Sequence, residues 1–556
     1  MLFALLQIVQ WLIFTSSRML ATQRPFDVQG LRDFESSWQL DQSPPINRTG
    51  NIIFNTASSL LQHWPNTRYR NGHTIVPGTI PVGTLLYRGA DAPEIPDAGD
   101  WVAMDTEHST IYCKGSQETG CWHLTFAVKR PLKIIYFDGS SAVKLEGGPM
   151  DTQDIIAWSR ARPDRLFDEE LRIHDLCRWG AKYAVDGFDG DRFVRFVFDF
   201  AKPPKSTLCS EVMLCDFSSG VEVVSILNIE GLGIQHKLPP TIPDDPESLL
   251  RAFEIRHAGS WHDHHPGDGR IVLDYPGLVS FYDTDLAPSL VPFRAGIERW
   301  DQRAGLISPT DATKIKERLE YVLRRPSPAV SGVDWKTLFQ VIIDRYSDRI
   351  ELVLYLLTSA PQDLDCAKRV QTQLRVMLTP YVLKSTMITK AHDVKATNAW
   401  AAPVFKQCAS SYPSSIATLR AAMTPSERLL LQALEEVTHE ICRVITKMWA
   451  SGIRARLESS EELPSPDHVR ELTEEWKEEM VNLTNWLDWS TWVKCNPTCA
   501  FEEMCYLPSW PPGLPLPLPG EEDIFAFLPE GNAGSQSDEW RRPQPTCIRR
   551  FEPYRF

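Results

Sequence analysis

The sequence predicts an α+β domain with a mixed sheet, followed by an α-helical domain and a proline-rich tail. Three observations predict this order. Before residue 238, apolar and polar residues alternate in short runs, as in half-buried strands. After residue 309 apolar residues recur at the spacing of one helix face, and after residue 508 prolines are too dense for a helix. These changes divide the chain into residues 1–21, 22–237, 238–308, 309–490 and 491–556.

The α+β domain is predicted from short elements. Residues 122–128 are the clearest strand, because Leu124, Phe126 and Val128 fall on one side of it. The turn Asp138-Gly139 closes a second strand. The expected strands are residues 84–87, 122–128, 132–137, 193–200 and 221–229, and the expected helices are residues 57–64, 152–158 and 169–183.

The helical domain carries strong helix signals. One helix begins at Thr424, which can cap it, while Pro425 suits the first turn and Glu427 completes a capping box. Its apolar stripe predicts the core of a helix bundle: Leu430, Leu434, Val437, Ile441 and Val444. A second stripe is formed by Phe339, Ile343, Tyr346, Ile350 and Val353. A further helix is predicted over residues 466–489.

The N-terminal segment predicts entry into the secretory pathway. Residues 2–14 are apolar apart from Gln7 and Gln10, a length typical of a signal peptide and short of the about 20 residues that span a membrane. Small residues suited to cleavage follow at Thr15 and Ser17. Residues 1–21 are therefore predicted to be a signal peptide or an uncleaved signal anchor. The alternative is an amphipathic first helix of the fold.

Cysteines and glycosylation sequons agree with export. Several of the 12 cysteines lie close together in the sequence: Cys113 with Cys121, Cys209 with Cys215, and Cys495 with Cys499, Cys505 and Cys547. In an oxidising compartment such groups indicate disulfides, whereas in the cytosol they would suggest free thiols or a zinc site. Asn47 and Asn482 begin Asn-X-Thr sequons, which predict N-glycosylation.

Composition, charge and missing motifs exclude several functional classes. With 43% hydrophobic and 23% charged residues, the chain is neither a polytopic membrane protein nor largely disordered. A formal net charge of −14 repels phosphate backbones, so nucleic acid is not expected as a partner. The sequence lacks the GxSxG, GxGxxG, Walker and HExxH motifs that identify common hydrolases, dinucleotide folds, kinases and zincins.

One ordered set of residues lies between residues 80 and 230. A strand ends in Arg88 and Gly89, the segment 101–109 leads toward Tyr112, and a late strand carries Glu222. This order resembles the ADP-ribosyltransferase-like fold, in which a first strand ends in Arg or His followed by Gly, and a late strand carries a Glu. The Ser-Thr-Ser element of the arginine-specific branch is absent, and no acidic residue lies two positions before Glu222.

The resemblance implies that NAD is the cofactor. Arg88 would bind NAD, since a guanidinium forms a planar fork that matches phosphate oxygens. Tyr112 would stack on nicotinamide, and Glu222 would be catalytic, because a carboxylate can stabilise the oxocarbenium-like ribose as nicotinamide leaves. Considered one at a time, Arg88 and Glu222 also fit ordinary surface charges on strands.

A second candidate site is Asp283-Thr284-Asp285, which follows an apolar run. Many glycosyltransferases hold Mn²⁺ with an Asp-X-Asp at the end of a buried strand, because hard oxygen ligands suit that ion. A luminal location would agree with such an enzyme. A structural aspartate that caps a turn explains the same residues.

Two further groups of polar residues are explained better by loops and turns than by a metal site or a catalytic site. A metal site could be drawn from His257, His262, His264, His265, Asp263 and Asp268, although residues 266–269 predict a solvated loop. Asp186, Asp189 and Asp191 could serve as paired carboxylates or bind Ca²⁺. Asp-Gly turns account for these three residues more simply.

Most of the chain also resembles a group of secretory proteins from filamentous fungi. The segments that carry this resemblance include QRPFDVQGLRDFESSWQLD, DTEHSTIYC, VMLCDFSSGVEVVS and RRPQPTCIRR. The resemblance implies export or membrane association and no particular activity.

The sequence therefore predicts an exported or luminal protein with one of three functions. It binds NAD as an active or degenerate ADP-ribosyltransferase-like protein, it is a non-catalytic secreted or cell-surface interaction protein, or it is a luminal metal-dependent glycosyltransferase. The expected partner is a protein or a small molecule. Membrane contact is expected only through an uncleaved N-terminal segment.

Overall fold

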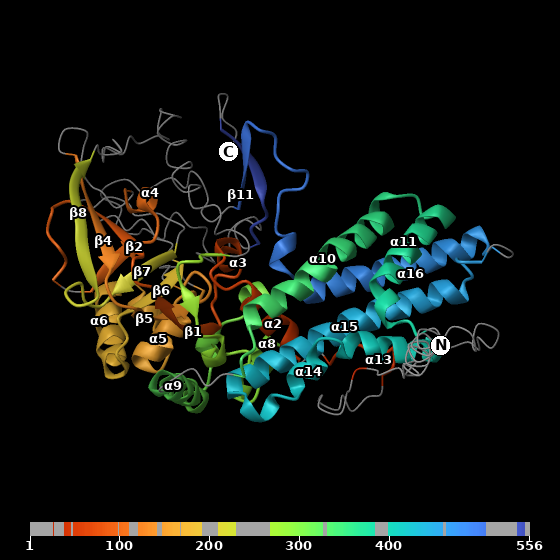
Figure 1. The fold of residues 1–556 in the computed structure, drawn as a ribbon, viewed down its shortest axis with the longest axis horizontal. Helices are drawn as coiled ribbons and strands as arrows, with labels where there is room; N and C mark the ends of the chain where they lie inside the picture. Colours follow the sequence, from red (N-terminus) through yellow and green to blue (C-terminus); the bar gives the residue numbers. More distant parts are fainter. Residues whose placement is uncertain are drawn as a thin grey trace, which may run out of the picture.

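The computed structural model places a sheet at one end of an elongated molecule and a helix bundle at the other (Figure 1). It describes residues 26, 38–45, 48–97, 99–110, 120–141, 147–166, 168–191, 210–229, 267–325, 331–383, 398–459, 463–507 and 542–550. The predicted leader at residues 1–21 and the predicted strand at 193–200 lie outside these ranges. In the described part of the chain, no helix combines the length and the apolar character needed to cross a bilayer.

The sheet is mixed, as predicted. Its strand order is β10-β1-β5-β6-β7-β3-β2-β4-β8, with β9 also paired to β1. β5 and β6 run parallel, and the other described pairs are antiparallel. The strands are β1 Thr74–Ile80, β2 Leu85–Ala90, β3 Asp100–Ala103, β4 Cys121–Val128, β5 Leu132–Phe137, β6 Gly187–Asp191, β7 Ser210–Leu214, β8 Val221–Ile229, β9 Val272–Leu273 and β10 Val279–Ser280.

Both faces of the central strands are buried. Helices α5 (Asp151–Trp158), α6 (Glu169–Gly180) and α9 (Pro309–Arg324) cover one face, where they share a core with Ile75, Ile135, Phe137, Phe188 and Met213. The residues of the opposite face join the core of the helix bundle: Val76, Leu86, Leu124, Phe126, Ile134 and Val212. Burial on both sides explains why β5 is apolar at nearly every position.

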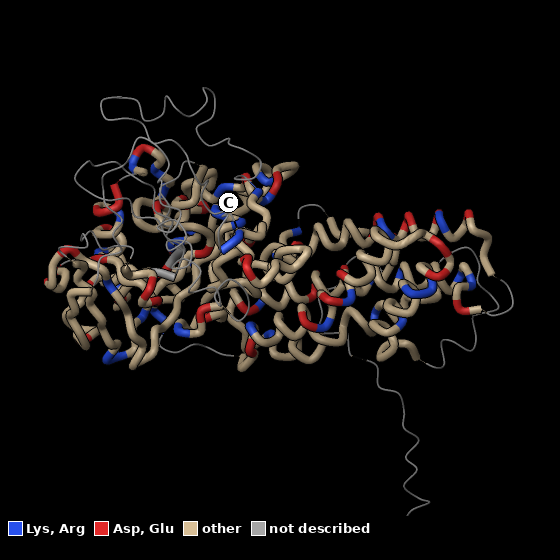
Figure 2. Tube along the Cα trace, turned by 90° about the horizontal axis from the view of Figure 1, so that it is seen from above, with Lys and Arg blue, Asp and Glu red and all other residues tan. Residues whose placement is uncertain are grey.

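The bundle consists mainly of α10 (Trp335–Ser359), α11 (Leu364–Leu378), α13 (Ala402–Ser410), α15 (Pro425–Arg454) and α16 (Pro466–Leu487). α15 is central, and its predicted apolar stripe from Leu430 to Val444 is fully buried, which confirms the bundle core. An N-terminal helix, α2 (Gly50–Ser58), packs against α15 and α10. Figure 2 shows acidic and basic positions interspersed along the bundle helices.

The predicted capping box of α15 is present. The Thr424 hydroxyl accepts a hydrogen bond from the Glu427 N–H at 3.0 Å, and the Glu427 carboxylate accepts one from the Thr424 N–H at 2.9 Å. The carboxylate is fully buried and also accepts hydrogen bonds from Ser331 and from the Trp335 indole. Glu427 therefore connects the start of α15 to the start of α10.

Replacing Glu427 by alanine is expected to lower the free energy of unfolding by about 2–4 kcal/mol, because the cap and several buried donors lose their acceptor. Urea denaturation measures the change. Glu478, exposed on α16, is the control, and its replacement by alanine should change stability by less than about 0.5 kcal/mol. Equal effects of the two substitutions would contradict the role given to the box.

Two local predictions were wrong. The helix expected over residues 57–64 is instead α2 followed by α3 (His63–Arg68), because Leu61 takes a left-handed φ of 64° between them. The expected Asp-Gly turns around Asp186–Asp191 form strand β6. At Gly187 an added Cβ would lie 2.6 Å from the Met213 carbonyl oxygen, so this glycine lets β7 approach closely instead of turning the chain.

The described disulfides join Cys177 to Cys215, Cys408 to Cys442, Cys495 to Cys505 and Cys499 to Cys547. Cys215 pairs with Cys177 and not with Cys209, its neighbour in the sequence, because α6 places Cys177 against the end of β7, next to Cys215. The tail sulfurs are bonded to one another, so they do not form the alternative zinc site. Cys121 is also disulfide-bonded, and Cys113, the cysteine grouped with it in the sequence, lies outside the described residues.

Candidate functional site

The structure does not bring Arg88 and Glu222 together. The Arg88 guanidinium, on β2, donates two hydrogen bonds to the Asp100 carboxylate on β3, at 2.5 and 3.1 Å. Arg88 is opposite Leu124 of β4, whereas Glu222 of β8 is opposite Ala127, three residues further along. Since side chains alternate along a strand, the register places Arg88 and Glu222 on opposite faces of the sheet. Tyr112 lies outside the described residues.

A buried polar pair lies beside the same strands. The short helix α4 (Thr106–Ser109) follows β3 and brings the Ser109 hydroxyl within 2.7 Å of Nε2 of His123 on β4. The His123 ring stacks on Tyr87, and burial lowers the pKa of His123, so its imidazole is neutral near pH 7. Both Ser109 and His123 are closed off from solvent.

Two of the other predicted aspartates, Asp283 and Asp186, have structural partners. Asp283 accepts hydrogen bonds from the N–H groups of Asp285 and Leu286, which is how an aspartate closes a turn. Asp186 binds both terminal nitrogens of Arg130. Asp189 is buried in β6.

One aspartate of the predicted metal group, Asp268, is buried and forms an ion pair with Arg270. The histidines of that group, His257, His262, His264 and His265, lie outside the described residues.

A groove of about 680 Å³ lies between two sets of segments. On one side are the segments around residues 68 and 300, which border the sheet, and on the other are the bundle helices α2, α10 and α16 together with the tail. This volume falls in the range of about 300–1,000 Å³ that is usual for ligand sites, which often lie between structural units. Partly exposed aromatic rings line it: Tyr69, Trp300, Trp486 and Trp492. Its polar lining includes Asn51, Thr484, Asn485 and Gln544. None of the predicted NAD or Asp-X-Asp residues lines the groove.

The aromatic rings of the groove are held in place. The Trp492 indole donates a hydrogen bond to the Ser347 carbonyl at 3.3 Å and stacks on Trp489 with ring centroids 5.2 Å apart. On the other side, the ring centroids of Trp300 and Tyr69 lie 4.9 Å apart. The Arg68 guanidinium carbon lies 4.9 Å from the centroid of the Trp300 ring. Fixed rings of this kind form preorganised flat surfaces.

An ion cluster forms the floor of the groove. Asp488 accepts hydrogen bonds from Arg68 at 2.9 Å, from Arg299 at 3.0 Å and from the Tyr69 hydroxyl. Burial, together with the Asp488 charge, raises the pKa of Tyr69. Asp488 ends α16 with a left-handed φ of 46°, and the other three residues belong to the sheet side of the groove. The cluster therefore connects the two ends of the molecule.

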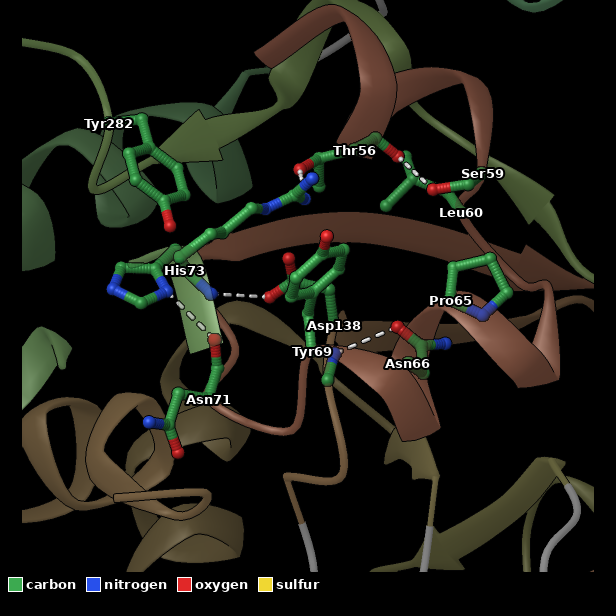
Figure 3. Close-up of a pocket in the computed structure, with 12 residues that line it drawn as sticks. Thr56, Ser59, Leu60, Pro65, Asn66, Tyr69, Asn71, His73, Asp138 and Tyr282 are labelled. Carbon is green, nitrogen blue, oxygen red and sulfur yellow. Dashed lines mark hydrogen bonds between the residues drawn. The ribbon is translucent and has the colours of Figure 1, made fainter. Parts of the chain in front are cut away.

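A small polar cavity of about 20 Å³ lies behind this floor, with room for about one water molecule. Figure 3 shows Tyr69 and Asp138 pointing into it. Asp138, in the turn after β5, accepts hydrogen bonds from the N–H groups of His73 and Thr74 at 2.7 and 2.6 Å. Burial raises the pKa of Asp138 to about 7 and lowers that of His73 well below its usual value. Tyr69 and Arg299 separate this cavity from the groove.

Sequence reasoning missed the groove. Its strongest local signal was the tryptophan-rich run at residues 485–492, which contains Trp486, Trp489 and Trp492. Trp300 and Arg299 lie almost two hundred residues earlier in the chain, so spacing alone did not connect them to this run. The predicted glycosylation residue Asn482 is exposed on α16, one turn before Trp486, whereas Asn47 lies outside the described residues.

Comparisons with known proteins identify fungal relatives. The model of the YPL277C N-terminal domain matches residues 45–122 and 114–243. The chain is 23% identical to the uncharacterized protein YOR389W of Saccharomyces cerevisiae, over 83% of this chain and 81% of the yeast protein. It is 25% identical to the uncharacterized protein YPL277C of the same yeast, over 55% of this chain and 75% of that protein. These names state no activity, and the matched domain includes Arg68 and Tyr69 but not the α16 side of the groove.

Proposed function

We propose that this protein is an exported binding protein that holds a small polar ligand in the groove between its sheet and its helix bundle. The observation that carries the proposal is the groove itself, a hollow of about 680 Å³ lined by fixed aromatic rings. The proposal shares its non-catalytic character with the second function predicted from the sequence, a secreted or cell-surface interaction protein, and differs from it in naming a small ligand.

The state of the ionisable groups supports binding over catalysis. The carboxylates of the groove are each engaged with a cation: Asp488 with Arg68 and Arg299, Glu351 with Lys494, and Glu298 with Arg542. A general acid or base needs a proton that it can exchange with a ligand. Groups held in ion pairs are better suited to fixing the shape and charge of a site.

The experiment is a thermal-shift screen of the full purified chain against four ligand classes: neutral oligosaccharides, nicotinamide nucleotides, short peptides and fatty acids. At least one class is expected to raise the melting temperature, because a ligand that binds only the folded state stabilises it. The shift should be lost in Trp486→Ala and kept in Trp158→Ala, since Trp158 lies on α5 outside the groove. A shift that survives Trp486→Ala and Trp300→Ala alike would place the ligand elsewhere.

Export has its own test. The disulfides support an oxidising compartment. If the chain enters the secretory pathway, the protein from its natural host should lose mass on treatment with a glycosidase, and Asn482→Gln should remove one glycan. A cytoplasmic, unglycosylated protein with reduced thiols would contradict export.

NAD-dependent ADP-ribosyl transfer remains the alternative. Its support is the order of elements, since β2 ends in Arg88-Gly89-Ala90 and β3 leads into α4 as the resemblance implies. Arg88 is engaged by Asp100, and Glu222 lies on the opposite face of the sheet, which weighs against this function. Incubation with NAD tests it: release of nicotinamide that is abolished by Glu222→Gln would favour the transferase over the binding protein.

A further inference from the structure

We infer that the ligand of the groove is a neutral oligosaccharide, bound by stacking on the groove tryptophans and by hydrogen bonds to amide side chains. This inference rests on the proposed binding function and names its ligand class. Charge, aromatic surfaces and the exposed amide side chains of the lining support it independently.

The charges of the groove favour a neutral ligand. Its lining contains Arg68, Arg299 and Lys494 as cations and Glu298, Glu351 and Asp488 as anions. All six form ion pairs. Arg68 and Arg299 pair with Asp488, Lys494 lies 2.8 Å from Glu351, and Glu298 pairs with Arg542. A charged ligand would have to compete with these pairs, and displacing a partner of the half-buried Asp488 cluster would leave a poorly solvated charge. A neutral ligand requires neither change.

The aromatic rings suit the faces of sugar rings. A pyranose has flat patches of C–H groups and a rim of hydroxyl groups, so it needs an apolar flat surface with polar groups around it. Trp300 lies on the sheet side of the groove, and Trp486 and Trp492 lie on the bundle side. The Trp300 ring contacts Tyr69, the Trp492 ring stacks on Trp489, and Trp486 packs against the bundle core. These partly exposed rings are therefore held in place, and little conformational entropy is lost when a sugar ring stacks on them.

The polar lining of the groove suits hydroxyl groups. Asn51 uses its amide nitrogen to donate to the Trp486 carbonyl at 2.6 Å, which fixes the side chain at the groove wall. Its side-chain oxygen is buried and accepts no hydrogen bond from the described residues. Because that oxygen is closed to solvent, the groups available to sugar hydroxyls are the exposed amides of Asn485 and Gln544, each of which offers donors and an acceptor. Asn485, Thr484 and Gln544 add amide and hydroxyl groups along the same lining.

The test is isothermal titration of the full chain with neutral gluco-, manno- and chito-oligosaccharides. At least one series should bind, with an affinity that hardly changes between low and high salt, because no ion pair forms with the ligand. Trp486→Ala should weaken binding by at least about tenfold, equivalent to about 1.4 kcal/mol. Trp486→Phe should retain most of the affinity, and Asn51→Ala should weaken it less than Trp486→Ala does.

Controls separate loss of the site from loss of the fold. Trp158→Ala should bind as the unchanged chain does, and each variant is accepted only if its melting temperature shows a folded protein. If Trp486→Ala does not fold, Trp300→Ala replaces it on the other side of the groove.

Two outcomes would overturn the inference in different ways. If a nucleotide, a peptide or a fatty acid binds in a Trp486-dependent manner while the neutral sugars do not, the groove is a binding site and the saccharide assignment is wrong. If no ligand of any class binds in a manner that depends on Trp486 or Trp300, both the saccharide assignment and the proposed binding function are wrong.

Discussion

Replacing Asp488 by alanine is expected to lower the free energy of unfolding by about 3–5 kcal/mol, the usual effect of removing one partner of a buried ion pair. Asp488 is 21% exposed, and its partners Arg68 and Arg299 are 18% and 17% exposed, so both guanidinium groups would lose their counter-charge away from bulk water. Alanine is also less suited than aspartate to a left-handed φ of 46°. Both effects act in the same direction.

Equilibrium denaturation in urea measures this change. Asp488→Asn keeps one hydrogen-bond-accepting oxygen and tolerates the left-handed backbone, so it should be intermediate between the unchanged chain and Asp488→Ala. The matched control is Asp467→Ala, which breaks the ion pair of Asp467 with Arg470 near the other end of α16. That pair is fully solvated, and its loss should change stability by less than about 1 kcal/mol. Equal losses for Asp467→Ala and Asp488→Ala would mean that the cluster does not stabilise the junction.

Asp138 is expected to make the protein less stable as pH rises toward 8. Burial raises its pKa from 3.8 to about 7, so between these values the folded state holds a proton that the unfolded state has released. The stability that this proton contributes is fully present below about pH 4 and is lost as pH rises through about 7. Asp138→Asn, which is neutral at every pH and keeps an acceptor for His73 and Thr74, should remove this dependence.

The expected size follows from the same pKa values. The pKa of Asp138 shifts from 3.8 to about 7, and each pH unit corresponds to about 1.4 kcal/mol. At pH 8 the free energy of unfolding of Asp138→Asn should therefore exceed that of the unchanged chain by at most about 4 kcal/mol. The difference between the two proteins should be much smaller at pH 5. Urea denaturation at both pH values measures it, and the titration of His73 largely cancels because both proteins contain this residue. A difference that stays constant with pH would contradict the prediction.

Local patterns in the sequence were sufficient for most of the helices and for several strands. The Thr424 capping box and the stripe behind it depend on residues within a few turns of one another, so α15 was predictable from sequence alone. The same holds for β4 and β8, which were predicted at residues 122–128 and 221–229 and occur at Cys121–Val128 and Val221–Ile229. β6 was not predictable, because Asp-Gly steps favour turns unless a neighbouring strand requires the missing side chain at Gly187.

The candidate site could not be predicted in the same way. The groove joins residues near position 68, residues near 300 and the run from 484 to 494, and no local rule connects segments so far apart. The positions of Arg88 and Glu222 show the same limit. Arg88 and Glu222 fit the order of the resembling fold, but the faces on which they lie depend on strand register, and the pairing of β2 and β8 with β4 sets that register.

Composition, periodicity and capping signals by themselves determined the α+β and helical halves of this protein, the buried stripe of α15 and the presence of disulfides. The tertiary structure decided which cysteines pair, which faces of the sheet carry Arg88 and Glu222, and that Tyr69, Arg299 and Asp488 meet beneath three tryptophans. The physical reason is the distance along the sequence over which each kind of interaction acts. Backbone propensity and apolar spacing act over a few residues, whereas a groove, an ion cluster or a disulfide depends on the packing of segments that are distant in the sequence.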